Sequence, residues 1–120
     1  MPRKTPDVRS FLPLALFDFQ VLTLLSAREL HGYGLVQASA ESFPEQPPLD
    51  VGTLYRVISR LLDERLIREV RAPDDAPTDR RVRRYYAVTD LGRHVVRGET
   101  DRLRALLTSP ATLGLLGASR

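Results

Sequence analysis

Residues 49–67 read LDVGTLYRVISRLLDERLI, and this stretch decides how the rest of the chain is interpreted. Asp50 stands where a helix N-cap belongs, three residues before Thr53, so the pattern predicts a helix over residues 51–64. At 100° per residue that helix has two different sides. The apolar side comprises Leu54, Ile58, Leu61 and Leu62. The polar side comprises Thr53, Arg56, Arg60 and Asp63. One face should therefore pack on a core, and the arginines suit the other to a negatively charged surface.

The composition is that of one soluble globular domain. The chain has 120 residues, of which 42% are hydrophobic and 28% charged, which is enough to bury a core. The net charge is only +3, but among the 18 basic residues Lys4 is the single lysine. Arginine suits paired contacts to phosphate or guanine. A GC-rich genome would produce the same bias, so this observation alone selects no function.

Several classes of function are disfavoured. The chain has no cysteine, which removes disulfides, thiolate nucleophiles and sulfur-ligated zinc. His31 and His94 lie far apart, and we find no nucleophile elbow, phosphate-binding glycine loop or metal-spaced carboxylate pair. We therefore expect no enzyme, cofactor or metal site.

The apolar run near the N-terminus resembles a signal peptide or membrane segment only at first sight. Asp18 and Gln20 interrupt it, and Arg28 follows too soon for a span of roughly 20 residues. We expect instead a buried helix over residues 13–27, no membrane association and a cytoplasmic location. A helix that is apolar all round must be covered on more than one side, which hints at a second subunit.

The remaining segments have clear local signals. Residues 1–10 predict a flexible N-terminal arm that could touch a polyanion through Arg3, Lys4 and Arg9. Residues 31–43 predict a second helix, ended by the prolines at 44, 47 and 48. Two β-prone runs, 66–72 and 82–88, predict a hairpin with a long charged tip. Thr89 is expected to cap a last helix over residues 90–107, whose apolar stripe ends in Leu103, Leu106 and Leu107.

This order predicts a mainly α fold with a small β-hairpin, a winged helix-turn-helix over residues 11–89. A C-terminal dimerisation helix would follow at 90–108, and a tail at 109–120 that is frayed or docked. The third helix would enter the major groove, with the hairpin reaching the flanking backbone. The basic residues suited to phosphate contact are Arg56, Arg60, Arg80, Arg81, Arg83 and Arg84. The dimer surface is expected at Leu16, Phe17, Leu24, Leu103, Leu106 and Leu107.

Three motifs in order make the chain resemble a PadR-family transcriptional regulator of the short kind with a single C-terminal helix. They are LHGYGL at 30–35, GTLYRVISRLLDERLI at 52–67 and RRYYAVTDLGR at 83–93. The resemblance implies a homodimeric repressor of double-stranded DNA, released in many members by a small-molecule effector. The residues that match the family's DNA-facing pattern are His31, Tyr33, Gly52, Thr53, Tyr55 and Arg56, together with the wing arginines.

Several of these roles stay open at the level of sequence. His31 could donate to a phosphate or satisfy local backbone, and Tyr55 could reach a phosphate or pack at the core edge. Gly52 would permit a close backbone approach. Tyr85 and Tyr86 fall on opposite strand faces, so one should be buried and the other can face outward.

Three features depart from the family pattern. Relatives usually have glycine at the position of Arg65, where a left-handed turn would cost about 1–2 kcal/mol. The chain has no tryptophan, so stacking of a flat drug between subunits is not expected. The last helix is short, roughly 27 Å for about 18 residues.

Two other binding functions compete with DNA recognition. A winged helix can serve as a protein-interaction module, although the basic third helix argues against that role. RNA is disfavoured because the major groove of duplex RNA is too narrow for a helix.

Overall fold

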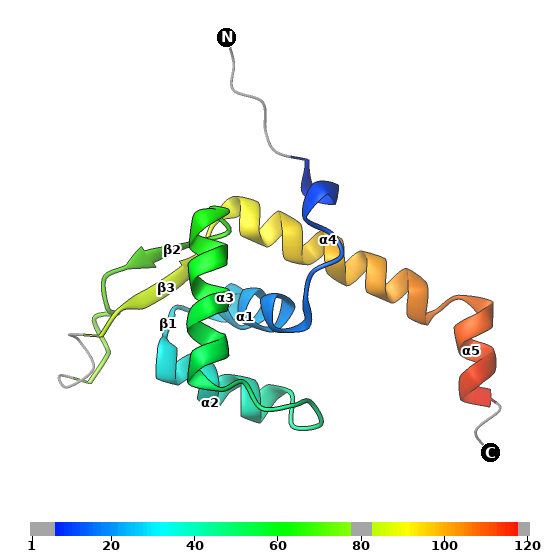
Figure 1. The fold of residues 1–120 in the computed structure, drawn as a ribbon, viewed down its shortest axis with the longest axis horizontal. Helices are drawn as coiled ribbons and strands as arrows, with labels where there is room; N and C mark the ends of the chain where they lie inside the picture. Colours follow the sequence, from blue (N-terminus) through cyan, green and yellow to red (C-terminus); the bar gives the residue numbers. More distant parts are fainter. Residues whose placement is uncertain (1–6, 78–82, 118–120) are drawn as a thin grey trace, which may run out of the picture.

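The computed structural model describes residues 7–77 and 83–117, and within them a small sheet lies at one side of a group of helices (Figure 1). The elements in chain order are η1 (Val8–Phe11), α1 (Leu16–Ala27), β1 (Leu30–His31), α2 (Gly32–Ser42), α3 (Val51–Asp63), β2 (Ile67–Val70), β3 (Tyr85–Val88), α4 (Asp90–Leu107) and α5 (Pro110–Gly117). The prediction of a mainly helical chain with a small β element is confirmed.

Helix α1 lies at the centre of the molecule and is covered by the chain itself. Helices α2, α3 and α4 and strand β3 all pack against it. Its buried residues are Asp18, Gln20, Val21, Leu22, Leu24 and Leu25. The chain itself therefore covers most of this helix, so its apolar character alone does not require the second subunit at which the sequence hints. Of its large apolar side chains, Leu16 at the N-terminal end stays exposed.

Helices α2 and α3 each begin at a side-chain cap. The Oδ1 atom of Asp50 accepts a hydrogen bond from the Thr53 amide at 2.8 Å, as the sequence predicts. His31 Nδ1 accepts from the Gly34 amide at 2.9 Å at the start of α2. The residues that α3 buries are Leu54, Val57, Ile58 and Leu61. The predicted two-sided helix is thus confirmed, with Val57 added to the buried side and Leu62 only partly buried.

Helix α3 ends in a left-handed turn at Arg65, which has a φ of 61°. The Arg65 amide donates to the Leu62 carbonyl at 3.0 Å, and the Leu66 amide donates to the Leu61 carbonyl at 2.9 Å. These two bonds form a Schellman motif, which usually places glycine at the left-handed position. The turn therefore keeps the usual geometry although a side chain occupies it.

The sheet has three antiparallel strands in the order β1-β3-β2. The predicted two-stranded hairpin is thus incomplete, because β1 pairs with the second edge of β3 through Leu30 opposite Tyr86. A two-residue strand has too few residues to show an alternating pattern. All four residues of β3 are buried, so both faces of this central strand are covered by other parts of the chain. The expectation that Tyr85 or Tyr86 faces outward is therefore wrong.

Helix α4 begins at Thr89, as predicted, where the hydroxyl accepts from the Gly92 amide at 3.0 Å. A Cβ atom on Gly92 would lie only 2.0 Å from the Leu66 carbonyl oxygen, so glycine lets α4 start directly against the end of α3. A Cβ atom on Gly98 would lie 3.0 Å from Val8 in η1. Residues 8–10, expected within a flexible arm, thus belong to a 3₁₀ helix that packs on α4.

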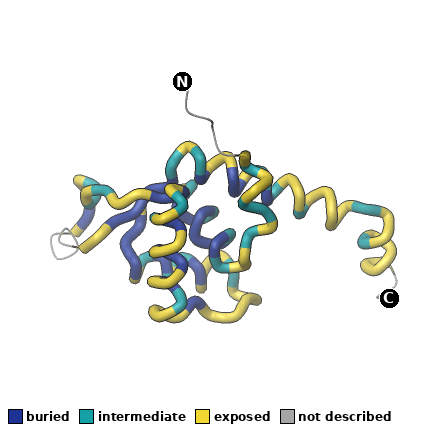
Figure 2. Tube along the Cα trace, turned by 45° about the horizontal axis from the view of Figure 1, so that its top comes forward, coloured by how far each residue is buried: buried dark blue, intermediate teal, exposed yellow. Residues whose placement is uncertain are grey.

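Residues 109–120 were expected to be frayed or docked, and their described part is neither. Pro110–Gly117 forms α5, and the hydroxyl of Ser109 accepts from the Thr112 amide at 3.3 Å just before it. The end of α4 and all of α5 extend away from the domain (Figures 1 and 2). We call residues 103–117 the C-terminal arm. Its exposed large apolar residues are Leu106, Leu107, Leu113, Leu115 and Leu116.

Candidate nucleic-acid interface

The N-terminal half of α3 carries a chain of polar side chains on its exposed face. The Thr53 hydroxyl donates to Asp50 Oδ2 at 3.1 Å, and Arg56 Nη2 donates to the Thr53 hydroxyl at 3.2 Å. The amide and hydroxyl of Thr53 hold the pKa of Asp50 below its ordinary value, so the cap stays ionised at neutral pH. These contacts hold the Arg56 side chain back along the helix toward its N-terminus.

A shallow pocket of about 410 Å³ lies beside this helix end and brings several predicted residues together. The side chains of Tyr33 and Tyr55 are 55% and 54% exposed. The pocket is lined by His31, Gly32, Tyr33, Tyr55, Arg83, Arg84 and Tyr86. A Cβ atom on Gly32 would lie 3.2 Å from the Tyr55 hydroxyl, so glycine at 32 leaves room for that phenol. Tyr55 is thus an exposed aromatic and not part of the core edge.

His31 is positioned by local structure. Its ring is buried, its Nδ1 caps α2, and it meets the Tyr85 ring edge-on with centroids 5.1 Å apart. The structure therefore favours the local-backbone role over direct phosphate contact, because an acceptor nitrogen inside a helix cap is not turned toward solvent. Its effect on a ligand would come from fixing the start of α2, where Tyr33 lies.

Arg60 is held by an ion pair within the chain. Its Nε donates to Asp18 Oδ2 at 3.1 Å, and its Nη2 forms a second, short bond to Asp18 Oδ1. The Asp18 side chain is only 9% exposed, against 48% for Arg60. Two of the five donors of Arg60 are thus engaged within the chain, and a direct phosphate contact by this residue stays a prediction.

Two of the four wing arginines, Arg83 and Arg84, lie within the described residues. Arg83 and Arg84 are exposed, and Arg84 Nε lies 3.7 Å from Glu69 Oε1 in a solvent-exposed pair. Such a pair is weak, so Arg84 can exchange Glu69 for another anion. Arg80 and Arg81 lie outside the described residues.

The first turn of α3 also shows what sequence reasoning missed. Gly52 is exposed, and the nearest atom to an added Cβ would be Asp50 Oδ1 at 3.4 Å. The close approach it permits is therefore not to another part of the described chain. Val51 is 57% exposed, although helical spacing groups it with Leu54 and Ile58. The first turn projects beyond the core, which periodicity cannot reveal.

The family model for the transcriptional regulator PadR-like family matches residues 21–98. That span contains the second half of α1, all of α2 and α3, the sheet and the first half of α4. The chain belongs to the PadR-like family. Its members are transcription regulators, which confirms the expectation that this chain is not an enzyme. None of the curated proteins compared with the sequence matches it significantly.

Solved structures share the winged-helix fold of this PadR-like chain. A PadR family transcription regulator from Clostridium difficile is 20% identical, with a TM-score of 0.64 over 77% of this chain and 91% of its own. A PadR-like regulator from Bacillus cereus is 22% identical, with a TM-score of 0.63 over 84% and 91%. Bacillus subtilis PadR in complex with operator DNA is 21% identical, with a TM-score of 0.57 over 74% and 47%.

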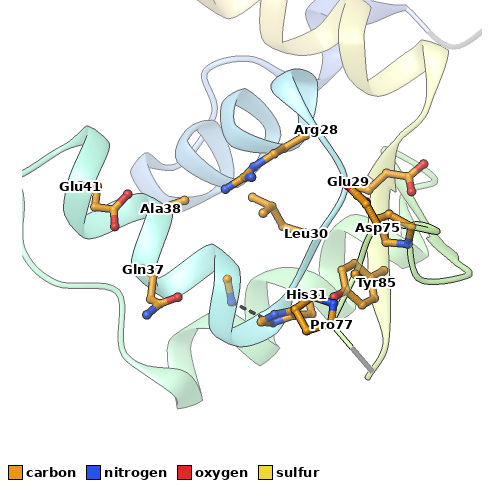
Figure 3. Close-up of a pocket in the computed structure, with 13 residues that line it drawn as sticks. Arg28, Glu29, Leu30, His31, Gln37, Ala38, Glu41, Asp75, Pro77 and Tyr85 are labelled. Carbon is orange, nitrogen blue, oxygen red and sulfur yellow. Dashed lines mark hydrogen bonds between the residues drawn. The ribbon is translucent and has the colours of Figure 1, made fainter. Parts of the chain in front are cut away.

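A second pocket, of about 580 Å³, lies on the other side of β1 (Figure 3). It opens between α2 and the segment after β2, and Arg28, Glu29, Glu41 and Asp75 line it along with Tyr85. Its rim therefore carries both signs of charge and lacks the arginine excess of the first pocket.

Among the described helices, none is long and apolar enough to cross a membrane.

The residues expected at a dimer surface separate into two groups. Leu24 is buried in the core cluster, so we remove it from that surface. Leu106 and Leu107 lie exposed on the C-terminal arm, and Leu103 is half-buried at its start. Leu16 is exposed at the N-terminal end of α1, with Phe17 partly buried beside it.

Proposed function

We propose that this chain is a homodimeric repressor that binds a pseudo-palindromic operator in double-stranded DNA. The observation that carries this proposal is the single exposed surface at the start of α3. There Arg56, Tyr33, Tyr55, Arg83 and Arg84 come from three separate segments and lie around one pocket and one helix end. Arginine and exposed tyrosine are the side chains that duplex recognition uses for phosphates and base edges.

Each part of that surface has a distinct role in the proposal. The N-terminal half of α3 enters the major groove, where Arg56 reaches a guanine edge and Val51 a thymine methyl group. The hydroxyls of Tyr33 and Tyr55 donate to phosphates beside the groove. Arg83 and Arg84 neutralise the flanking backbone, and the sequence assigns the same role to Arg80 and Arg81.

The dimer is supported by the C-terminal arm. The radius of gyration of the chain is 16.5 Å, against about 14 Å for a compact domain of this length. The excess reflects the arm, whose leucines expose a run of apolar surface of the kind that marks an interface. We propose that this surface and Leu16 pack against a second copy related by a two-fold axis.

Three further features complete the proposal. Repression follows from occupying the operator, and a small-molecule effector releases it by changing the arrangement of the two subunits. We place the protein in the cytoplasm because its proposed partner is chromosomal DNA. A winged-helix module that binds another protein is the alternative, and the arginines and tyrosines around α3 favour DNA over it.

The experiment begins with selection of duplexes by the purified protein from a random library. We expect a pseudo-palindrome with half-sites about 34 Å apart. In fluorescence anisotropy at physiological salt, it should bind about 10³-fold or more tightly than a scrambled duplex. Sedimentation should show a dimer at the concentration used. No enriched sequence, or equal binding to both duplexes, would reject the operator and favour the protein-interaction module.

Variants assign the roles within that surface. Arg56→Ala should lose base preference at one position per half-site, by about 1–3 kcal/mol for a paired guanine contact. Arg84→Ala should weaken all duplexes alike and reduce the slope of log affinity against log salt by about 0.9 per phosphate. Arg97→Ala is the matched control, since the Arg97 side chain is 73% exposed on α4, outside the surface at the start of α3. Uniform loss in both variants would show that α3 does not read bases.

A further inference from the structure

Asp18 and Gln20 are the buried polar residues of helix α1, and each contacts one helix of the helix-turn-helix. Gln20 is 1% exposed, and its Oε1 accepts from the Ser39 hydroxyl of α2 at 2.5 Å. Asp18 accepts the two bonds from Arg60 of α3. Burying polar groups is unfavourable unless they are paired, so an apolar helix would have packed at lower cost. Gln20 and Asp18 therefore fix the orientations of α2 and α3 relative to α1, which apolar contacts alone define less sharply.

The pairing of Asp18 with Arg60 has the geometry for that purpose. Two donors of one guanidinium meet two oxygens of one carboxylate, an arrangement that fixes both distance and rotation. Asp18 lies in the first turn of α1, where the helix end also favours its negative charge. A partly buried ion pair of this kind contributes little net stability, because removing the Asp18 carboxylate from water offsets much of the attraction. Its best-supported effect is a defined orientation.

The orientation in question is that of α3 relative to α1. Leu16, two residues before Asp18, belongs to the surface proposed to meet the second subunit. The Asp18 ion pair therefore connects the end of α1 that carries the proposed dimer surface to the recognition helix α3. In a two-fold dimer, the angle between α1 and α3 sets the separation and tilt of the two recognition helices, and these must match the half-site spacing.

We propose that Asp18 is a positioning residue for operator recognition, which acts by holding Arg60 and with it the recognition helix. This inference rests on the proposed DNA-binding function. It differs from a direct role for Arg60, in which the guanidinium would contact a phosphate. The two roles make opposite statements about Asp18, because loss of the carboxylate would free Arg60 for a phosphate.

The test uses the full chain and the operator selected by the wild type, with versions whose half-sites are moved one base pair closer or further apart. The variants are Asp18→Asn, Arg60→Gln, Arg60→Lys and the double variant of Asp18→Asn with Arg60→Gln. Anisotropy over a salt series gives the spacing preference and the salt slope. In the variants that break the Asp18–Arg60 pair, we expect the preference for the selected spacing to fall about tenfold. This is the loss of affinity that one mismatched base pair typically causes. The salt slope should remain that of the wild type, and the double variant should be no worse than either single one.

Arg60→Lys is the decisive variant, because lysine keeps the charge but cannot form the paired fork. A positioning role predicts that it loses the spacing preference, whereas a phosphate role predicts that it binds as the wild type does. Arg97→Gln and Asp63→Asn are charge-matched controls at exposed positions, and both should keep the preference. Denaturant unfolding of each variant separates loss of fold from loss of position.

Three results would overturn the inference. A salt slope reduced by about 0.9 in Arg60→Gln, with normal binding by Asp18→Asn and Arg60→Lys, would make Arg60 a phosphate contact. Lower stability with an unchanged spacing preference would make the pair purely structural. Absence of any preferred duplex for the wild type would instead reject the proposed function itself, and this inference with it.

Discussion

Replacing Arg65 by glycine should stabilise the protein, because this turn holds a side chain in the left-handed region. A non-glycine residue there costs about 1–2 kcal/mol, and glycine loses about 0.5–1 kcal/mol through its greater freedom in the unfolded chain. The difference is a net gain of about 0.5–1 kcal/mol in the free energy of unfolding. The turn itself is pinned from outside, since the Thr89 hydroxyl donates to the Arg65 carbonyl at 2.7 Å. Both backbone bonds of the motif therefore survive the substitution.

The assay is urea unfolding of the wild type, Arg65→Gly and Arg65→Ala at one protein concentration, since a dimer's apparent stability depends on concentration. Arg65→Ala removes the guanidinium but keeps the Cβ atom, so it should stay within about 0.5 kcal/mol of the wild type. Arg65→Gly should raise the midpoint with an unchanged m-value and raise the melting temperature by about 2–5 °C. If glycine proves no more stable than alanine, the left-handed φ carries no cost here and the reasoning fails.

Three shorter predictions concern Gly92, Glu99 and Leu107. Gly92→Ala would force a Cβ atom to within 2.0 Å of the Leu66 carbonyl oxygen, so denaturant unfolding should show a loss of about 3 kcal/mol or more. The paired Arg102 holds the pKa of Glu99 below its ordinary 4.5, so the carboxylate stabilises the fold fully above that pH. The difference in unfolding free energy between wild type and Glu99→Gln should therefore shrink as pH falls below 4.5. Leu107→Glu should lower dimer affinity in sedimentation without unfolding the domain, since its side chain is exposed.

The parts of the fold that sequence predicts are those with local causes. Asp50 and Thr89 bind the amides three residues later, and these contacts involve no distant part of the chain. The caps and the helical periodicity therefore place α3 and α4 correctly from the sequence alone. The positive φ of Arg65 is likewise set by the end of α3, so the family pattern locates it.

The parts that sequence misses depend on distant partners. Strand β1 exists only because Leu30 meets Tyr86, 56 positions later. Arg60 falls on the polar side of its helix by periodicity, but its partner Asp18 is 42 residues away. A helical wheel records which direction a side chain leaves its helix and not what it meets there. Periodicity therefore places Arg60 on the exposed face of α3, but it cannot reveal that the guanidinium is paired with a distant carboxylate.

The exposed face of α3 and the apolar C-terminal arm fit one arrangement of two subunits on DNA. Leu103 is 13 residues beyond the start of α4, which at 1.5 Å per residue is about 20 Å along the helix axis. Recognition helices 34 Å apart each lie about 17 Å from the two-fold axis. An apolar arm that begins about 20 Å from the domain end of α4 can thus reach that axis while α3 stays in the groove. If the arm packed on its own domain instead, its leucines would be covered, yet Leu106 and Leu107 are exposed. The exposed apolar surface of the arm is therefore consistent with the dimer that we propose on successive major grooves.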